Sequence, residues 1–178
     1  MSTKTLKTIS MDLSTDSIDR AIKQVKRFQD DLRRMCEELV QKLVADGIEI
    51  ARMQVVSFEA VFTGYLEQSI QGVYFASEHC GVIYSDVYYA IFVEYGSGYQ
   101  GTTEDYPGEY PEGYKPDESG HGEQGWWYPA PWGYYIPKGG DPLAWSNGMV
   151  PRPFMYNTLR WLEEAAAKEG INMFRSSD

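Results

Sequence analysis

A long stripe of apolar residues near the N-terminus constrains the fold more than any other feature of this chain. Its members recur mostly at intervals of three or four residues, and charged residues fill the opposite face. The apolar positions are Ile18, Ala21, Ile22, Val25, Phe28, Leu32, Met35, Cys36, Leu39, Val40 and Leu43. This spacing predicts an amphipathic helix. At about 1.5 Å per residue, about thirty such residues span roughly 45 Å.

The residues that flank this stripe indicate where the helix begins and ends. The cluster Ser14–Ser17 offers several N-cap side chains. Apolar residues from Ile48 to Met53 continue the pattern, so we expect the helix to reach about Met53 and to bend or loosen at Gly47. The helix could be a coiled-coil arm or a core helix laid across a sheet. The core helix is favoured, because the stripe is wider than a seam of two positions per heptad.

Extended segments follow the long helix. Residues 69–76 and 81–87 have the pattern of two paired strands, and residues 77–80 form the turn of the resulting β-hairpin. Further on, prolines 129, 131 and 137 interrupt the aromatic segment 126–136. Because proline cannot donate to a central ladder, we expect this segment to be an edge strand or an extended ribbon.

The C-terminal region predicts a second helix. It begins after Pro151–Pro153, because proline is tolerated in a first helical turn, and we expect Gly170 to end it. Its packing face holds Phe154, Leu159, Trp161, Leu162, Ala165 and Ala166. The predicted fold is α+β, with the long N-terminal helix and the C-terminal helix packed on one face of a small antiparallel β-sheet. Residues 1–14 are predicted to be a flexible arm and residues 15–178 a single domain.

Residues Tyr88–Gly98 form the densest apolar segment and carry one charge, that of Glu94. We predict a short helix here, capped by Asp86 and ended by Gly96, with a buried strand as the alternative. A carboxylate in apolar surroundings needs hydrogen-bond donors. We therefore expect Glu94 to accept from N–H groups of the Gly96–Gly98 turn or from an arginine. One face of the predicted helix holds Tyr88, Ile91, Phe92 and Tyr95.

Residues 97–125 differ in composition from the rest of the chain. They are rich in glycine, proline and tyrosine, and their seven acidic residues and single Lys115 give a net charge of −6, against −10 for the whole chain. A segment of this kind cannot bury enough apolar area to fold by itself, so we expect a mobile loop. The overall negative charge argues against a surface that neutralises nucleic-acid phosphates.

No constellation of residues predicts catalysis, a cofactor or a metal site. His79 and His121 fall in turn or loop sequence, and no further Cys or His completes a tetrahedral site beside His79. Cys36 and Cys80 are predicted to be buried or half-buried thiols in a reducing compartment. No apolar run is long enough to span a membrane and residues 1–17 lack a signal core, so we expect a soluble protein made in the cytoplasm.

Three stretches carry a family resemblance through their order and spacing. Tyr89–Gly98 is similar to a Tyr-Ala…Val-Glu-Tyr/Phe-Gly-Thr/Ser-Gly motif, Thr63–Ile70 to Thr-Gly-x-Leu-x-x-Ser-Ile, and Gly148–Met155 to Gly-Met-x-Pro-x-Pro-Phe-Met. Together they resemble the head–tail joining, or tail-completion, proteins of phages with long non-contractile tails, over roughly residues 47–169. The matching positions are Thr63, Gly64, Leu66, Ser69, Tyr89, Ala90, Glu94, Gly96, Gly98, Gly148, Met149, Pro151, Pro153, Phe154 and Met155.

The resemblance implies a structural virion protein of the phage neck or tail and not an enzyme. Such a protein forms a ring, of six subunits by analogy with tail symmetry, that joins the capsid connector to the tail tube. Its partners are then copies of itself, the connector or head-closure proteins, and the tail-terminator or tail-tube proteins. DNA passes through the ring without specific binding, and no membrane or cofactor takes part. The protein is synthesised in the bacterial host cytoplasm and ends in the virion.

Within such a ring, the acidic loop could take either of two placements. Facing the channel, its carboxylates would repel the DNA phosphates. Facing a neighbouring subunit, they would meet a basic patch such as Arg152 or the Arg33–Arg34 pair. The neighbour is favoured, because a channel lining has no need of aromatic rings. The candidate interface residues are Tyr106, Tyr110, Tyr114, Trp126 and Trp127.

The tryptophans also support a rival class of function, a carbohydrate-binding module built on segment 126–135. Trp126, Trp127, Trp132 and Trp145 could stack on the apolar face of a sugar. The same rings could equally form an edge strand and a protein interface. The order of the three motifs favours the phage protein.

Overall fold

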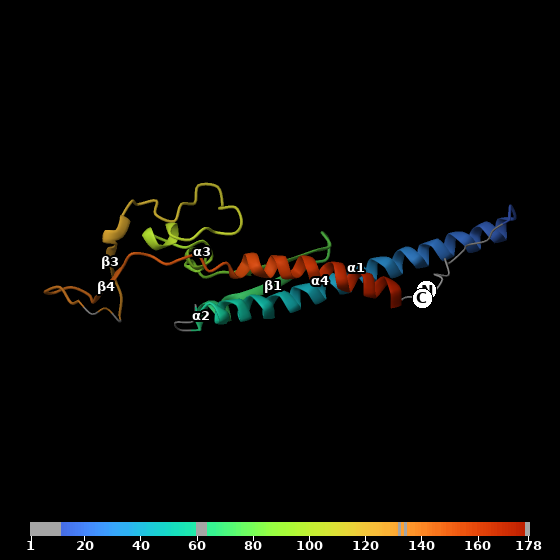
Figure 1. The fold of residues 1–178 in the computed structure, drawn as a ribbon. Coiled ribbons are helices and arrows are strands. Elements are labelled where there is room, and N and C mark those ends of the chain that lie inside the picture. The colour runs from blue at the N-terminus through green and yellow to red at the C-terminus, as the bar shows by residue number, and fades with distance from the viewer. Residues whose placement is uncertain (1–11, 60–63, 132, 134, 177–178) are drawn as a thin grey trace.

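A computed structural model of the chain describes residues 12–59, 64–131, 133 and 135–176, so most of the predicted arm 1–14 lies outside the described residues. Its first element is one long helix, α1, over Thr15–Ser57 (Figure 1). The Ser14 side chain caps α1 by accepting a hydrogen bond from the N–H of Ser17 at 3.3 Å. The predicted helix is confirmed, and Gly47 does not interrupt it.

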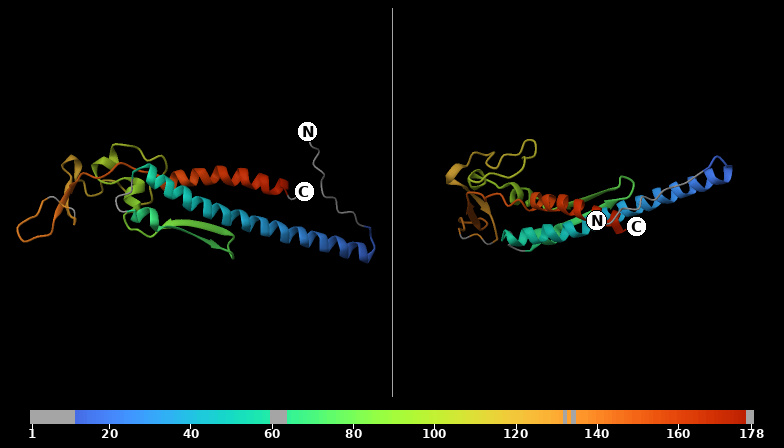
Figure 2. Two further views of the ribbon diagram at one scale, coloured as in Figure 1. Left: turned by 90° about the horizontal axis from the view of Figure 1, so that it is seen from below. Right: turned by 45° about the vertical axis from the view of Figure 1, so that its right-hand side comes forward.

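The body of the molecule is built on α1, which lies between the other two main elements in the left view of Figure 2. On one side lies the predicted hairpin, in which β1 (Ile70–Phe75) pairs antiparallel with β2 (Cys80–Ser85). On the other side lies the last helix, α4, over Phe154–Ser176. The α+β class, the two helices and an antiparallel sheet are confirmed. The predicted packing of both helices on one face of the sheet is wrong, because α4 packs mainly on α1.

Gly47 is buried at the level where both outer layers approach α1. A Cβ atom at this position would lie 2.4 Å from Cδ1 of Ile83 on the hairpin and 3.2 Å from Cδ2 of Leu162 on α4. The missing side chain therefore lets β2 and α4 come close to the same turn of the helix.

The course of α4 corrects two expectations. The helix continues through Gly170 to Ser176, so the predicted end at Gly170 is wrong. One helical glycine costs only about 1 kcal/mol relative to alanine, and apolar residues continue the helical pattern beyond it. The predicted packing face is also partly wrong, because Leu159 is 53 % exposed whereas Phe154 and Thr158 are buried.

The short helices connect these layers. α2 covers Tyr65–Ser69 and was not predicted, and α3 covers Ala90–Tyr95. α3 confirms the expected short helix and its end at Gly96, where φ is +79°. The predicted cap at Asp86 is wrong, since the helix begins after Tyr89 without a side-chain cap.

The buried face of α3 also differs from the expected one. Ile91 and Phe92 are 39 % and 41 % exposed, whereas Val93 and Glu94 are buried. A helix this short is oriented by what its residues bond to, and Glu94 turns toward the beginning of α4, as described below.

The end of the molecule opposite the start of α1 holds a second sheet (Figure 1). β3 (Trp126–Pro129) pairs antiparallel with β4 (Leu143–Ser146), which places Trp127 opposite Trp145. Within the described residues β4 is the one strand paired with β3, as expected for a segment that ends in proline. The strand β4 itself was not predicted. The loop 97–125 lies beside this sheet and contains 3-10 turns at Tyr99–Thr102 and Gly122–Gln124.

The first half of α1 projects beyond the rest of the described molecule (Figures 1 and 2). Every residue from Ile22 to Arg34 is exposed, including Phe28 at 61 %. The core-helix interpretation therefore applies only to the second half of α1, which supplies the buried Ala51 and Val55. Cys36 lies on the outer half and is exposed, contrary to expectation, whereas Cys80 is half-buried.

Candidate functional site

The motifs that carry the family resemblance are far apart in the chain but meet in one core. The first contributes Leu66 and Ile70, the second Val93 and the third Phe154, each at most 5 % exposed. Thr63 lies outside the described residues. The complete cluster is Ala51, Val55, Leu66, Ile70, Val93 and Phe154.

The first motif is tied to the hairpin by a hydroxyl. Gly64 precedes α2 with φ of +71°, and the buried Ser69 closes α2 by donating to the carbonyl of Leu66 at 2.7 Å. The Ser69 oxygen also lies 2.7 Å from that of Ser85, at the end of β2. The serine of this motif therefore fixes α2 to the hairpin.

The second and third motifs are joined through their backbones. Ser97 and Met149 exchange two N–H···O bonds of 2.9 Å, and the N–H of Arg152 donates to the carbonyl of Val93 at 2.8 Å. Gly148 makes this crossing possible: its φ is +100°, and a Cβ atom there would lie 1.7 Å from the carbonyl oxygen of Ser97. No other residue could occupy that position without moving the backbone.

Glu94 lies at the centre of this junction and is 4 % exposed. Its Oε2 accepts from the N–H of Met155 at 2.8 Å, and its Oε1 accepts from the N–H of Tyr156 at 2.9 Å. Oε1 also accepts from the hydroxyl of Tyr106 at 2.8 Å. The expected partners, the Gly96–Gly98 turn or an arginine, are wrong. The first N–H groups of a helix have no partner within it and form its positive end, so α4 supplies the donors instead.

The surroundings of Glu94 shift the pKa of its carboxyl group. Burial raises the pKa of the Glu94 carboxyl, and the hydrogen bonds from Met155, Tyr156 and Tyr106 offset that rise in part. Burial and the bond to Glu94 raise the pKa of Tyr106 as well, so its hydroxyl keeps its proton and acts as the donor. The arrangement suits a fixed structural contact between a neutral phenol and an acceptor.

Tyrosines hold the acidic loop against α3, contrary to the expected mobile loop. The ring centroid of Tyr95 lies 4.7 Å from that of Tyr106, 6.0 Å from that of Tyr110 and 5.4 Å from that of Tyr114. The Tyr114 hydroxyl donates to the carbonyl of Gly96, and burial raises the pKa of Tyr114 to about 12. The tyrosine rings therefore supply apolar contacts that hold the loop on α3, although the loop is rich in acids.

The loop also uses two of its own acids internally. Asp117 accepts hydrogen bonds from the N–H groups of His121 and Gly122, at 3.1 and 3.0 Å. The His121 ring packs on Trp126, with centroids 4.8 Å apart. Glu123 is exposed but accepts a hydrogen bond from the Tyr99 hydroxyl at 3.0 Å. The remaining acids of the loop are exposed: Glu104, Asp105, Glu109, Glu112 and Glu118.

Only part of the predicted loop interface is available to a partner. Tyr106, Tyr114 and Trp126 are half-buried in the contacts above, whereas Tyr110 is 38 % and Trp127 is 50 % exposed. Trp127 belongs to an exposed aromatic group with Tyr135, 5.5 Å away between ring centroids, and with Trp145 on β4. Trp132, which the sequence grouped with these rings, lies outside the described residues.

An apolar groove of about 770 Å³ was not predicted from the sequence. α1 forms its floor, β2 and α4 form its walls, and α3 closes one end with Tyr95. Its lining comes from four elements, as far apart in the chain as α1 and α4, which a linear pattern does not reveal. Its apolar lining includes Val40, Val44, Ile83, Ile91, Leu159 and Leu162.

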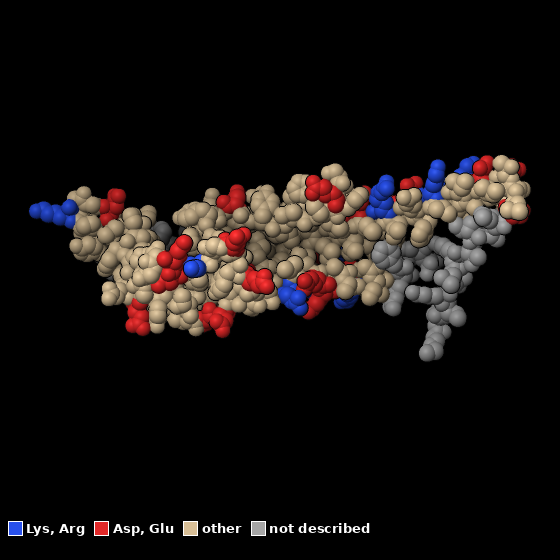
Figure 3. All heavy atoms as spheres, turned by 90° about the horizontal axis from the view of Figure 1, so that it is seen from above, with Lys and Arg blue, Asp and Glu red and all other residues tan. Residues whose placement is uncertain are grey.

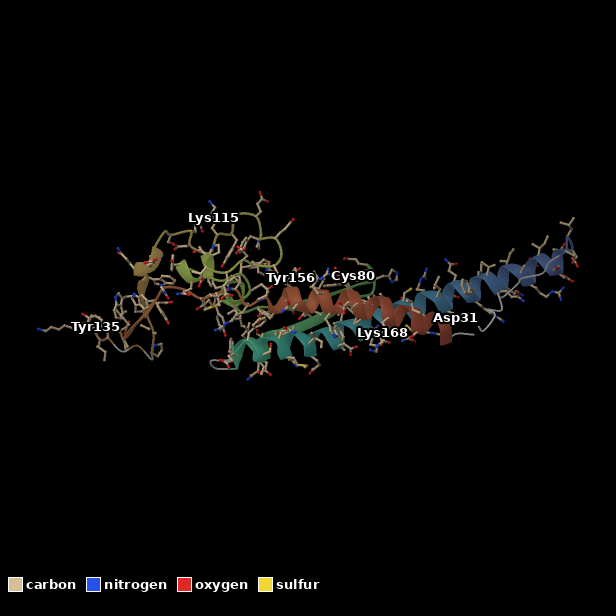
Figure 4. The ribbon with its side chains drawn as sticks, viewed as in Figure 1. Asp31, Cys80, Lys115, Tyr135, Tyr156 and Lys168 are labelled. Atoms are coloured by element: carbon tan, nitrogen blue, oxygen red, sulfur yellow. The ribbon has the colours of Figure 1, made fainter. Side chains whose placement is uncertain are left out.

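Side chains that could bind a metal do not gather in the described part of the chain. There, no group of three or more His, Cys, Asp or Glu residues could hold a metal ion. His79 lies in the hairpin turn, with Nδ1 3.7 Å from a carboxylate oxygen of Glu37 (Figure 4 shows the side chains). Among the same described residues, no helix is both long and apolar enough to cross a membrane.

In comparisons with known proteins, no family model, no curated protein and no solved structure matches this chain. The relation to phage joining proteins therefore remains a prediction from the three motifs. What the structure adds is where those motifs lie with respect to one another.

Proposed function

We propose that this chain is a structural virion protein of the phage neck or tail, which forms a ring that joins the capsid connector to the tail tube. The observation that supports this most is the meeting of the three resemblance motifs in one core and one hydrogen-bonded junction.

The shape and charge of the molecule suit a ring component. A closed ring needs two different surfaces on each subunit, one to contact each neighbour. The chain offers an exposed helical arm at one end and an acidic, aromatic part at the other (Figure 3). The net charge of −10 also suits a passage for DNA without adhesion, because negative charge repels phosphates.

A phage whose genome encodes this chain provides the test. With a nonsense mutation in the gene, we expect filled heads and finished tails to accumulate unjoined, as seen by electron microscopy of the lysate. Purified protein added to that lysate should restore joined particles, and the wild-type gene on a plasmid should do the same. Normal virions assembled without the protein would refute the proposal.

The exposed aromatic group supports carbohydrate binding as the second candidate. Three exposed rings lie on the β3–β4 sheet and in the segment that connects its two strands, where a sugar ring could stack. They are Trp127 at 50 %, Tyr135 at 53 % and Trp145 at 40 % exposed. A glycan array decides between the two. Binding that is lost on Trp127→Ala but kept on Tyr88→Ala, an aromatic residue exposed elsewhere, would favour this candidate over the neck protein.

A further inference from the structure

The projecting half of α1 carries an apolar stripe that nothing described covers. Exposed apolar surface of this kind on a helix usually marks a site of interaction. The stripe rises by about 1.5 Å per residue and so extends roughly 21 Å over fifteen positions. Its members are Ile18 at 37 %, Ile22 at 47 %, Val25 at 52 %, Phe28 at 61 % and Leu32 at 37 % exposed.

Positions 20–29 within this stretch are basic. Arg20, Lys23, Lys26 and Arg27 follow one another with no acid between positions 20 and 29. Lys23, Lys26 and Arg27 make no hydrogen bond or ion pair within the described residues, and all are exposed. Blue side chains stand along this projecting end in Figure 3, although the chain as a whole has a net charge of −10.

The groove on the body of the molecule matches this arm in length and polarity. Its α4 wall runs from Phe154 to Ala166, which at about 1.5 Å per residue is roughly 18 Å. Its exposed apolar side chains include Leu159 at 53 % and Ile91 at 39 %. An amphipathic helix that inserts its apolar face into such a groove is a common mode of recognition.

The charge next to the groove has the opposite sign to that of the arm. Tyr95 closes the groove and packs on Tyr106 and Tyr110 of the acidic loop. The loop residues adjacent to those two tyrosines include the exposed Asp105 and Glu109, and the loop as a whole carries −6. A basic helix that lies in the groove therefore comes near exposed carboxylates of the loop.

We propose that the projecting half of α1 in one copy lies in the groove between β2 and α4 of a second copy, with its basic residues beside that copy's acidic loop. The contact joins two different surfaces, so repetition gives a closed ring or an open chain of subunits. It deepens the proposed ring and rests on that proposal only for closure. The basic partner of the loop is then mainly Arg20–Arg27, not Arg152.

The competing arrangement is a coiled coil between two arms. In a parallel coiled coil built on the apolar stripe, Gln24 would face Gln29 of the partner helix and Asp31 would face Cys36. Neither pair joins opposite charges, so no ion pair between the helices would fix their register. The experiment below treats this arrangement as one of its outcomes.

Three aspartate variants at matched exposure test the contact. Val25→Asp changes the arm, Leu159→Asp changes the groove, and Val56→Asp is the control at the other end of α1; the three native side chains are 52 %, 53 % and 52 % exposed. We expect the first two to weaken self-association of the full chain by about tenfold or more and the control to leave it within about twofold. Sedimentation velocity over a concentration series gives these values, and circular dichroism confirms that each variant is folded.

Charge reversal gives an independent readout. Lys23→Glu with Arg27→Glu on the arm, or Asp105→Lys with Glu109→Lys on the loop, should each weaken self-association and reduce its salt dependence. In an equimolar mixture of the two double variants, the acidic arm of one variant can meet the basic loop of the other. Opposite charges then face each other again, so association in the mixture should recover.

The remaining outcomes distinguish a failure of this contact from a failure of the proposed function. If Val25→Asp abolishes association and Leu159→Asp does not, the arms pair with each other. If the wild type remains monomeric at about millimolar concentration, or the mixture fails to recover, the contact does not exist, although head–tail joining in the lysate could still depend on the protein. If the contact holds but joining does not need the protein, the proposed function fails instead.

Discussion

At the scale of single residues, Glu94 connects three segments that are distant in the sequence. It belongs to α3, it accepts from the first N–H groups of α4, and it accepts from Tyr106 of the acidic loop. The sequence predicted that this buried carboxylate needs donors but pointed to the wrong ones. A signal for the right ones exists in the sequence, because Pro151–Pro153 marks a helix start whose N–H groups need an acceptor.

Replacing Glu94 by glutamine tests this connection. One acceptor oxygen becomes an NH₂ group that faces a donor, either a backbone N–H of α4 or the Tyr106 hydroxyl. We expect Glu94→Gln to lower the free energy of unfolding by about 1–3 kcal/mol. Urea denaturation measures it, with the exposed Glu164→Gln on α4 as the control within about 0.5 kcal/mol of wild type. Equal stability of both variants would show that the three bonds contribute nothing net.

The raised pKa of Glu94 gives a second prediction. Burial raises the folded-state pKa of Glu94 above the ordinary value of 4.5, so the folded state binds the carboxyl proton more tightly than the unfolded state does. The stability that this tighter proton binding adds to the folded state is fully present below about pH 4.5 and is lost as the pH rises through the folded-state pKa. The stability of the wild type minus that of Glu94→Gln should therefore decrease with rising pH. Denaturation at a series of pH values from about 4 to 7 checks the sign, which an increase would contradict.

At the scale of elements, the contact between α1, β2 and α4 depends on the absence of a side chain at Gly47. Alanine there gains about 1 kcal/mol of helix propensity but places a methyl group against Ile83 and Leu162. Overpacking of this kind costs roughly 1–3 kcal/mol. We therefore expect Gly47→Ala to be neutral or destabilising.

The second helical glycine supplies a matched control. Among the described residues, a Cβ at Gly170 would meet only Leu39 Cδ2, at an ordinary 3.7 Å, so Gly170→Ala should stabilise the protein by up to about 1 kcal/mol. Thermal or chemical denaturation of the two variants gives the comparison. If Gly47→Ala stabilises the protein as much as Gly170→Ala does, the close approach at Gly47 is not there.

The acidic loop is the element for which the sequence was most misleading. Its charge predicted a mobile segment, but Tyr106 and Tyr114 fasten it to Glu94 and Gly96. Tyr106→Phe removes one hydroxyl and should cost about 1–2 kcal/mol in unfolding free energy, since the lost bond is made to a carboxylate. Tyr110→Phe changes the same cluster without an observed bond and should cost less than about 0.5 kcal/mol. Limited proteolysis should cut the loop of the first variant faster, and equal rates would count against the fastening.

At the scale of the whole molecule, the elements with strong local patterns could be predicted and their arrangement could not. The period of α1, the hairpin, the start of α4 and the α+β class all followed from the sequence. The second strand of the β3–β4 sheet, the groove, and the exposure of half of α1 did not, because each depends on which segments lie next to one another. A stripe such as Ile22 to Leu32 has the same pattern whether it is buried in its own chain or awaits a partner.

The most direct test of the account is a cryo-electron microscopy reconstruction of the particles that contain this chain. We predict a ring of six copies, closed between the capsid connector and the tail tube, with the first half of α1 of each copy seated on its neighbour. A neck without density for this chain, or particles in which native mass spectrometry finds it only as a dimer, would contradict the account.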